Sequence, residues 1–378
     1  MLIGVPSESA SRERRVALTP SAVERLTGQG YEVLVEKGAG ERALFADDDY
    51  SAAGARVVAQ HSEVWNADLV CVVARPAPAE ESYLGPNTAL LGLLEPLDHP
   101  KAVLRLAHTG ATLLSFDLLP RTTRAQAMDA LSSQATAAGY QAVIVAAEHS
   151  PRFLPMLTTA AGTVPPAGVL VLGAGVAGLQ AIATARRLGA RVSGYDVRAA
   201  AQEQVESLGA GFVSLDLDPQ DAEASGGYAR ELEKDDQARQ LAQLAPFVAS
   251  ADVVITAAAI PGRRAPLLIT AQMLEAMAPG SVVVDLSAST GGNCELTKPD
   301  EVVSFAGVTI LGPTDLPSRV PTHASHLYAR NVTELVLYVS TPDGLQLDPK
   351  DEIVAGCLVA QGGELVHPEV LAAAGTAL

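Results

Sequence analysis

The stretch that decides the fold runs from Val169 to Asp196 and reads VLVLGAGVAGLQAIATARRLGARVSGYD. Its first four residues predict a buried strand, and Gly173, Gly175 and Gly178 fit the pattern G-x-G-x-x-G. In that pattern the first glycine permits a tight turn and the second lets a diphosphate approach the backbone. The third lets the following helix pack closely on the strand. The segment therefore predicts a strand, a phosphate-binding turn and a helix of the Rossmann type.

Asp196 follows the next predicted strand, where a carboxylate can accept hydrogen bonds from the ribose of an adenosine. A carboxylate at this place repels a 2′-phosphate, so the sequence favours NAD(H) over NADP(H). Arg198 is the one neighbour whose charge favours a phosphate instead. The alternative interpretation of Asp196 is a solvated charge at the end of a strand.

Outward from this segment, strands alternate with helical patterns, which is typical of doubly wound parallel sheets. A first series has strands at 2–6, 31–36, 67–73 and 89–94 and a helix that Thr19 caps before Pro20. A second series has strands at 169–172, 191–196, 212–215, 252–257, 282–286 and 308–311, with helices at 176–188 and 200–208. A long helix over 124–148, a loop over 157–168 and a tail helix over 332–340 are also expected.

We therefore expect an α/β protein with two Rossmann-like, doubly wound parallel-sheet domains joined by long connecting helices. The length of 378 residues favours two domains. We expect one domain to comprise residues 1–126 with 318–378. The other, residues 127–317, would bind the dinucleotide.

Composition excludes several classes of function. The net charge of −17 disfavours nucleic acid and anionic lipid as partners, because both require a basic surface. The three cysteines, at 71, 294 and 357, have no metal-ligand spacing, and His323 and His326 have no third ligand nearby, so no metal site is expected. The N-terminus turns polar after six residues and no apolar run is long enough to cross a membrane, so we expect a cytoplasmic protein without direct membrane insertion.

A set of longer motifs carries a resemblance to a known family. The motifs are RTTRAQAMDALSSQ (121–134), AGY (138–140), GTVPP (162–166), the turn from Gly173 to Gly178, DVR (196–198), EQVESLG (203–209), GGYA (226–229), IPG (260–262) and GGNC (291–294). With these motifs the chain resembles the NAD(H)-binding component, domain I or the first α subunit, of proton-translocating NAD(P) transhydrogenase. The opening ERRVALTP (13–20) is shared with alanine dehydrogenase, which has the same ancestry.

The resemblance implies an AB-specific, proton-translocating NAD(P)⁺ transhydrogenase that is active only with partner subunits. Hydride would pass from NADH on this chain to NADP⁺ on a partner domain III, and a membrane subunit would couple the step to proton movement. The chain would be peripheral to the inner membrane through those partners, and a homodimer. Catalytic roles would fall to Arg121, Gln126, Asp129, Ser132 and Tyr228.

Within that picture, Arg121, Asp129 and Ser132 would hold the nicotinamide carboxamide, and Gln126 would reach toward the nucleotide of the partner domain. Tyr228 would lie on a loop that closes over NAD(H). Asp129 and Ser132 are three residues apart, so we expect them on one face of the long helix. The NAD(H) path would be lined by Gly173, Gly175, Val176, Gly178, Asp196, Val197, Arg198, Gly227 and Ala259.

Two other functions stay open from the sequence. Alanine dehydrogenase needs a lysine on the strand at 70–74 and a histidine acid/base on the strand at 89–95. This chain has Val72-Val73-Ala74-Arg75 and Leu93-Leu94-Glu95 there, so the proton-transfer groups of that reaction are missing. A non-catalytic NAD-binding subunit is the other alternative. Direct hydride transfer between two nicotinamides needs positioning and exclusion of water rather than an acid or base.

Overall fold

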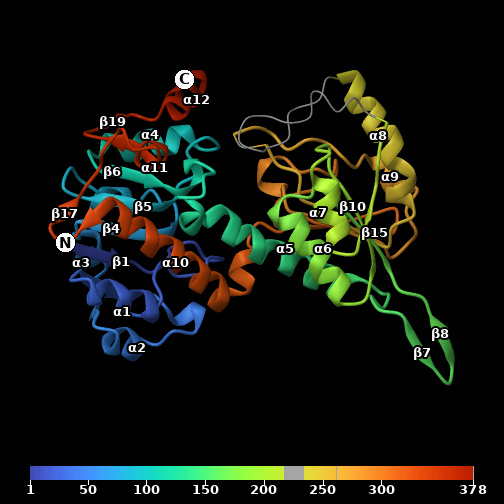
Figure 1. Ribbon diagram of the computed structural model, residues 1–378, viewed down its shortest axis with the longest axis horizontal. Helices are drawn as coiled ribbons and strands as arrows, with labels where there is room; N and C mark the ends of the chain where they lie inside the picture. The colour runs from blue at the N-terminus through green and yellow to red at the C-terminus, as the bar shows by residue number, and fades with distance from the viewer. Residues whose placement is uncertain (217–233, 261, 378) are drawn as a thin grey trace. The chain divides into compact units, whose positions relative to one another are not determined.

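The computed structural model describes residues 1–216, 234–260 and 262–377. The chain divides into two compact units (Figure 1). Unit 1 comprises Met1–Gln134 and Pro317–Leu378, and unit 2 comprises Ala135–Leu316. The domain boundaries expected from the sequence, at 126/127 and 317/318, stay predictions. Among the described residues, no helix is both long and apolar enough to span a membrane.

Unit 1 is built on an eight-stranded sheet in the order β19-β18-β6-β5-β4-β1-β2-β3. The six strands from β1 to β6 are parallel, while β18 and β19 of the tail add antiparallel pairs at the edge beside β6. The strands are β1 (Leu2–Val5), β2 (Glu32–Glu36), β3 (Arg56–Val58), β4 (Leu69–Ala74), β5 (Ala89–Leu93), β6 (Thr112–Ser115), β18 (Leu358–Gln361) and β19 (Glu364–Leu365).

Helices cover both faces of this sheet because its strands are apolar on both sides. Leu69, Cys71 and Val73 of β4 join a core with helices α1 and α10, whereas Val70 and Val72 join a core with α3, α4 and α12. The helices of unit 1 are α1 (Pro20–Gly28), α2 (Asp47–Ala52), α3 (His61–Trp65), α4 (Pro100–His108), α10 (Pro321–Val339), α11 (Glu352–Cys357) and α12 (Pro368–Ala377). A short pair, β16 (Ser340–Thr341) and β17 (Gly344–Leu345), follows α10.

Unit 2 has a seven-stranded sheet in the order β11-β10-β9-β12-β13-β15-β14, parallel except for its last pair. Val169 and Val171 face a core shared with α5, α6 and α7, and Leu170 and Leu172 face a core shared with α8 and α9. The elements are α5 (Ala130–His149), β9 (Gly168–Leu172), α6 (Val176–Arg187), β10 (Arg191–Tyr195), α7 (Ala201–Ser207), β11 (Gly211–Phe212), α8 (Lys234–Ala249), β12 (Val253–Thr256), α9 (Ala271–Glu275), β13 (Val282–Asp285), β14 (Val302–Phe305) and β15 (Val308–Leu311).

The fold class is therefore the expected one, an α/β protein with two Rossmann-like units, and several local predictions need correction. The long helix begins at Ala130 rather than 124, after the short 3₁₀ turn η4 (Gln126–Met128). The segment 157–168 is not all loop: β7 (Leu157–Thr159) and β8 (Gly162–Val164) form a hairpin. The tail helix is longer than predicted, since Pro321 starts α10 eleven residues before residue 332.

Two smaller corrections concern the ends of elements. Thr19 precedes α1 as expected, but its side chain makes no capping hydrogen bond and its Oγ lies 3.1 Å from the Ser21 Oγ instead. The strand expected at 212–215 is only the two residues of β11. The α5 helix crosses the division between the units at Gln134, and the return crossing lies in the 3₁₀ turn η7 (Leu316–Arg319).

Candidate functional site

The three glycines of the fingerprint lie between β9 and α6, and each has a distinct environment. Gly173 has a φ of +99°, and a Cβ there would come within 2.8 Å of the Ala258 nitrogen. A Cβ on Gly178 would stand 1.8 Å from the Gly173 oxygen. At Gly175, the N-cap of α6, nothing lies within 4 Å of the Cβ position. The outer glycines are thus required by backbone contacts, and the middle one leaves open space at a helix N-terminus, which suits a diphosphate.

This turn lies at the topological switch point of unit 2. The chain leaves β9 toward β10 on one side, and β12 pairs with β9 on the other. Ligands of doubly wound sheets bind at the carboxyl ends of the strands at such a point. The loop after β12 lies against Gly173 and carries the predicted residue Ala259, which is exposed. Val176 is 40% exposed at the start of α6.

Asp196, at the end of β10, connects the turn to Arg198. Its Oδ2 accepts the Ala174 N–H at 2.8 Å and an Arg198 Nη at 2.9 Å. Its Oδ1 accepts the Arg198 backbone N–H at 2.9 Å and the Arg198 Nε at 2.8 Å. Burial opposes ionisation of this carboxyl, but the bonds from Arg198 and Ala174 hold its pKa below the ordinary value. Arg198 therefore forms a two-pronged ion pair with Asp196, a relationship that the sequence did not predict. Val197, between them, packs against the core that contains Leu170 and Leu172.

The loop after β12 is held by polar residues for which the sequence predicts no role. The buried Asn293 amide accepts the Ala258 N–H at 3.2 Å and donates to the carbonyls of Ala258 and Pro266 at 2.9 and 2.7 Å. The carboxylate of Asp285, fully buried at the end of β13, accepts five hydrogen bonds, including the Asn293 N–H at 2.8 Å. The GGNC motif at 291–294 could have indicated the role of Asn293. A polar residue in a glycine-rich motif after a buried strand can hold a neighbouring loop by hydrogen bonds.

In unit 1, Asp129 and Ser132 are bonded to each other. Asp129 Oδ1 accepts the Ser132 N–H at 2.8 Å, and Oδ2 accepts the Ser132 hydroxyl at 2.6 Å. The expectation that both lie on one helical face needs correction, because Asp129 has a ψ of 84° and precedes α5. It caps the helix, since a side-chain oxygen satisfies an otherwise unpaired N–H of the first turn. With its proton donated to Asp129, the hydroxyl adds acceptor capacity only.

The other predicted residues of this region lie before α5. Gln126 starts η4 and is exposed, and Arg121 is exposed in the loop ahead of it. Gly227 and Tyr228 lie outside the described residues. The four described catalytic candidates belong to unit 1, and the nucleotide-binding candidates belong to unit 2.

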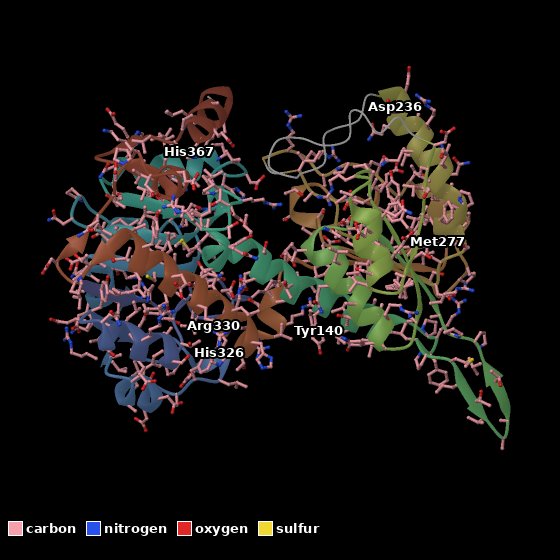
Figure 2. The ribbon with its side chains drawn as sticks, in the orientation of Figure 1. Tyr140, Asp236, Met277, His326, Arg330 and His367 are labelled. Carbon is pink, nitrogen blue, oxygen red and sulfur yellow. The ribbon has the colours of Figure 1, made fainter. Side chains whose placement is uncertain are left out.

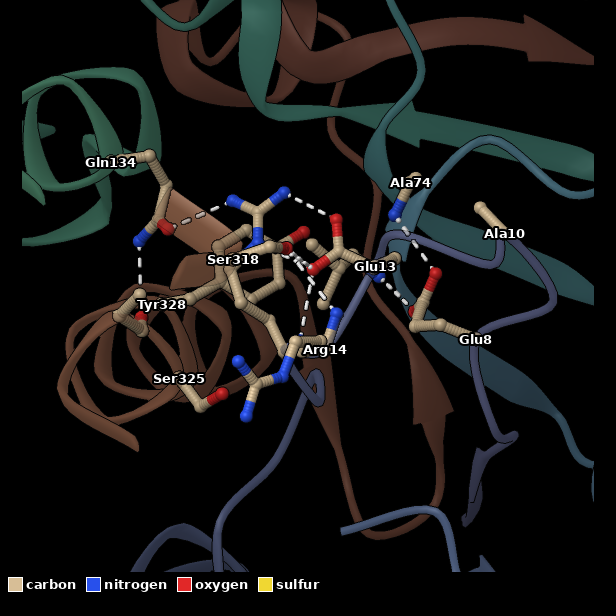
Figure 3. A network of polar contacts seen from close by, with 12 residues as sticks. Glu8, Ala10, Glu13, Arg14, Ala74, Gln134, Ser318, Ser325 and Tyr328 are labelled. Atoms are coloured by element: carbon tan, nitrogen blue, oxygen red, sulfur yellow. Dashed lines mark hydrogen bonds and ion pairs between the residues drawn. The ribbon is translucent and has the colours of Figure 1, made fainter. Parts of the chain in front are cut away.

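A network of buried polar side chains surrounds Arg15 (Figure 3). The Arg15 guanidinium donates to both carboxylate oxygens of Glu13, at 2.8 and 2.6 Å, and to the Gln134 side chain at 2.9 Å. Ser318 donates to Glu13 from the other side. Burial opposes the charge of Glu13, but the bonds and charge of Arg15 hold the pKa of its carboxyl below the ordinary value. Arg15 is thus paired within the chain.

Beside this network, at the carboxyl ends of β4 and β5, three further ionisable side chains lie buried or paired. Glu8 accepts the Val73 N–H at 2.6 Å, and burial raises the pKa of its carboxyl to about 8. Arg75 donates to the Leu94 carbonyl at 3.0 Å and lies 3.4 Å from the Glu95 carboxylate. These strand ends therefore carry the Glu8 carboxyl and the Arg75–Glu95 ion pair. They carry neither the lysine nor the histidine that alanine dehydrogenase needs.

His326 and the three cysteines have structural environments. His326 lies on α10 (Figure 2). Its ring packs edge-on against the ring of Phe45, with centroids 5.1 Å apart. Cys71, Cys294 and Cys357 are buried, and burial raises the pKa of Cys294 to about 11 and of Cys357 to about 12. Within the described part of the chain, no three histidine, cysteine or acidic side chains are grouped to hold a metal ion.

The sequence and the fold of this chain are similar to those of known proteins. Two family models match: the alanine dehydrogenase/PNT N-terminal domain over residues 4–138 and the C-terminal domain over residues 142–368. The first of the split alpha subunits of the Rhodospirillum rubrum NAD(P) transhydrogenase is 45% identical over 97% of this chain and 98% of its own length. A transhydrogenase crystal structure from Sinorhizobium meliloti superposes with a TM-score of 0.88 at 43% identity, over 97% of this chain and all of that one. The alanine dehydrogenase of Bacillus subtilis is 30% identical over 94% of this chain and 88% of its own length.

The chain is therefore an oxidoreductase of an NAD-dependent family. This assignment rests on both family models, on the relatives at 42 to 45% identity and on the matching crystal structure. This chain belongs to the alanine dehydrogenase/PNT family, on the branch of the NAD(P) transhydrogenase alpha subunits.

Proposed function

We propose that this chain is the NAD(H)-binding component, domain I, of a proton-translocating transhydrogenase. It holds NADH so that hydride passes to NADP⁺ bound on a partner domain III. The observation that carries the proposal is the open N-cap of α6 at Gly175 beside Asp196, in a chain that matches a split transhydrogenase alpha subunit over nearly its whole length. NADP(H) belongs to the partner in this proposal, because Asp196 repels a 2′-phosphate.

Each candidate residue then has a task in binding or orientation. The free N–H groups at the start of α6 bind the diphosphate. The acceptor oxygens of Asp129 and Ser132 take the NH₂ of the nicotinamide carboxamide, and Arg121 donates to its carbonyl oxygen. Gln126, exposed on η4, reaches the nucleotide of the partner domain. By the family resemblance, Tyr228 keeps its role on the loop that closes over NAD(H), and Gly227 keeps its place on the NAD(H) path. Bound NADH supplies the hydride, so the chain itself contributes position and exclusion of water.

Alanine oxidation is the alternative reaction within the family, and two features of unit 1 disfavour it. The ends of β4 and β5 carry the Arg75–Glu95 pair where that reaction needs a lysine and a histidine, so the two groups on which alanine oxidation depends are missing there. The guanidinium of Arg15, a group that could bind the carboxylate of a keto acid, is engaged by Glu13 and Gln134. A small acid would have to displace a buried internal partner.

We further propose the setting in which the chain works. A membrane subunit moves the proton, so this chain is a cytoplasmic protein that lies at the inner membrane through its partners, without nucleic acid and without inserting itself. A homodimer is supported by the segment that includes the β7–β8 hairpin, where Phe153, Met156 and Val164 are 59%, 62% and 44% exposed. Apolar side chains gathered on one exposed segment are typical of an interface.

The test is reconstitution of hydride transfer. The chain is mixed with a separately prepared NADP(H)-binding component, NADH and an NADP⁺ analogue whose reduced form absorbs at its own wavelength. We expect reduction of the analogue only when both proteins are present. Binding of NADH without any transfer would instead support a non-catalytic NAD-binding subunit. Alanine-dependent reduction of NAD⁺ by the chain alone would support the alanine dehydrogenase function.

A further inference from the structure

The Asp196 carboxylate has a full set of hydrogen-bond partners. A carboxylate offers about four acceptor positions, and here Oδ1 and Oδ2 each accept two bonds. The side chain is only 7% exposed, and that of Arg198 is 21% exposed. In this state Asp196 has no position left for the hydroxyls of an adenosine ribose.

The four bonds differ in how easily they can be exchanged. Two come from backbone N–H groups, of Ala174 in the glycine turn and of Arg198 itself, and these are fixed by the fold. The other two come from the guanidinium, which lies at the end of a long rotatable side chain. Only these two can leave without movement of the backbone. A ribose presents two hydroxyl donors, at the 2′ and 3′ positions, which matches the two exchangeable places.

We propose that Arg198 is an internal occupant of the ribose site, which the adenosine ribose displaces from Asp196 when the dinucleotide binds. This inference rests on the proposed function, because it takes Asp196 as the acceptor of the ribose hydroxyls. In the ligand-free chain the guanidinium keeps a nearly buried carboxylate paired. On binding, the charge-assisted pair must be broken, which offsets part of the gain from the ribose contacts. Arg198 therefore weakens NADH binding and speeds release, and it is not a receptor for a 2′-phosphate.

The inference predicts an effect of unusual sign: loss of Arg198 tightens binding. We expect Arg198→Met to lower the dissociation constant for NADH by roughly 3- to 30-fold, because the competing pair is gone. Reduced nicotinamide mononucleotide lacks the adenosine, so its affinity should not change. The matched control is Arg187→Met, which removes the same charge from an exposed position on α6 and should leave NADH affinity at the wild-type value. The measurement is a fluorescence titration of each full-length variant with each nucleotide.

The outcomes separate this inference from the function on which it rests. Failure of the wild-type chain to bind NADH would contradict the proposed function itself. If wild type binds NADH and a folded Arg198→Met variant binds it equally or more weakly, the displacement is overturned, and weaker binding would make Arg198 a direct contact of the nucleotide. Should Arg198→Met fail to fold, Arg198→Lys decides, since it keeps the charge but not the two-pronged geometry. Tighter NADH binding by this variant supports displacement, and equal or weaker binding overturns it.

Discussion

The Asp129 carboxylate caps helix α5 through Ser132, accepting its backbone N–H at 2.8 Å and its hydroxyl at 2.6 Å. Asp129 and Ser132 therefore stabilise the start of α5 and are also proposed to bind the nucleotide. Their side-chain oxygens are the acceptors assigned to the nicotinamide carboxamide. The two tasks can be separated, since the capping bond goes to the backbone and survives loss of the hydroxyl.

Ser132→Ala should therefore slow hydride transfer more than it lowers stability. The variant keeps the backbone N–H bond to Asp129 and loses the hydroxyl bond to Asp129, which costs about 1 kcal/mol of unfolding free energy or less. Ser133→Ala is the control, because the Ser133 hydroxyl donates to Asn331 at 2.7 Å, away from Asp129. Reconstituted transfer rates and denaturant unfolding of both variants make the comparison. Equal transfer rates for the two variants would remove Ser132 from the site.

Gln126→Asn should slow hydride transfer by about tenfold and leave NADH affinity nearly unchanged, since a side chain shortened by one methylene misplaces the partner nucleotide. Gln126 is exposed on η4, where it can reach another protein. Transfer rate and NADH titration are measured on the same preparation. A large loss of NADH binding would mean that Gln126 faces the nucleotide of its own chain.

The two glycines of the α6 turn should respond in opposite ways to alanine. Gly175→Ala should fold with wild-type stability, because nothing lies within 4 Å of its Cβ position, yet bind NADH about tenfold more weakly, because the methyl fills the approach to the diphosphate. Gly178→Ala should lose about 2 kcal/mol of unfolding free energy or more, since its Cβ would overlap the Gly173 oxygen. Thermal unfolding and NADH titration check both. Wild-type NADH affinity in Gly175→Ala would contradict a diphosphate at this turn.

Asn293→Ala should weaken NADH binding and lower the unfolding free energy by about 3 kcal/mol, because backbone groups of Ala258 and Pro266 lose their partners. Thr297→Val is the control: it removes one bond to Asp285, at 2.7 Å, without touching the loop after β12. The control should lose stability but retain NADH affinity once folded. Equal nucleotide binding by both variants would show that the loop needs no support from Asn293.

Because of Glu8, the free energy of unfolding should fall as the pH rises from about 4.5 to about 8. Burial raises the pKa of its carboxyl from 4.5 to about 8, so the folded chain holds a proton there that the unfolded chain has lost. The unfolding free energy then decreases with pH across this window, by at most about 1.4 kcal/mol per pH unit. Glu8→Gln should flatten the slope, while Glu364→Gln, an exposed control, should not. An unchanged slope in Glu8→Gln would mean that Glu8 is ionised at neutral pH.

The sequence predicted the parts of the fold that a local pattern determines. Val169–Leu172 forms a strand because its side chains are all apolar. A short run of this kind before a glycine turn is buried best in a sheet that is covered on both faces. In the edge strand β14, exposed residues alternate with half-buried ones, and this pattern is too weak to be predicted. The β7–β8 hairpin escaped for a similar reason, since its strands are only three residues long and too short to show an alternating pattern.

The sequence indicated the residue types of the candidate site but not how they pair. The motifs indicated Asp196, Arg198, Asp129 and Ser132, but no local rule says that the first two form an ion pair or that Asp129 ends the helix instead of lying in it. The role of Asn293 depends on a contact 35 residues away with Ala258. Such long-range hydrogen bonds arise only when the sheet brings separate loops to the same edge.

The central claim, direct passage of hydride from NADH on this chain to a nucleotide on a partner, is tested by isotope transfer. NADH carrying deuterium on the transferred position of the nicotinamide is mixed with this chain, the NADP(H)-binding component and NADP⁺ in ordinary water. The mass of the NADPH formed is then measured by mass spectrometry. Retention of essentially all the deuterium in NADPH is the expected result, whereas NADPH that carries hydrogen from water, or no NADPH at all, would contradict the claim.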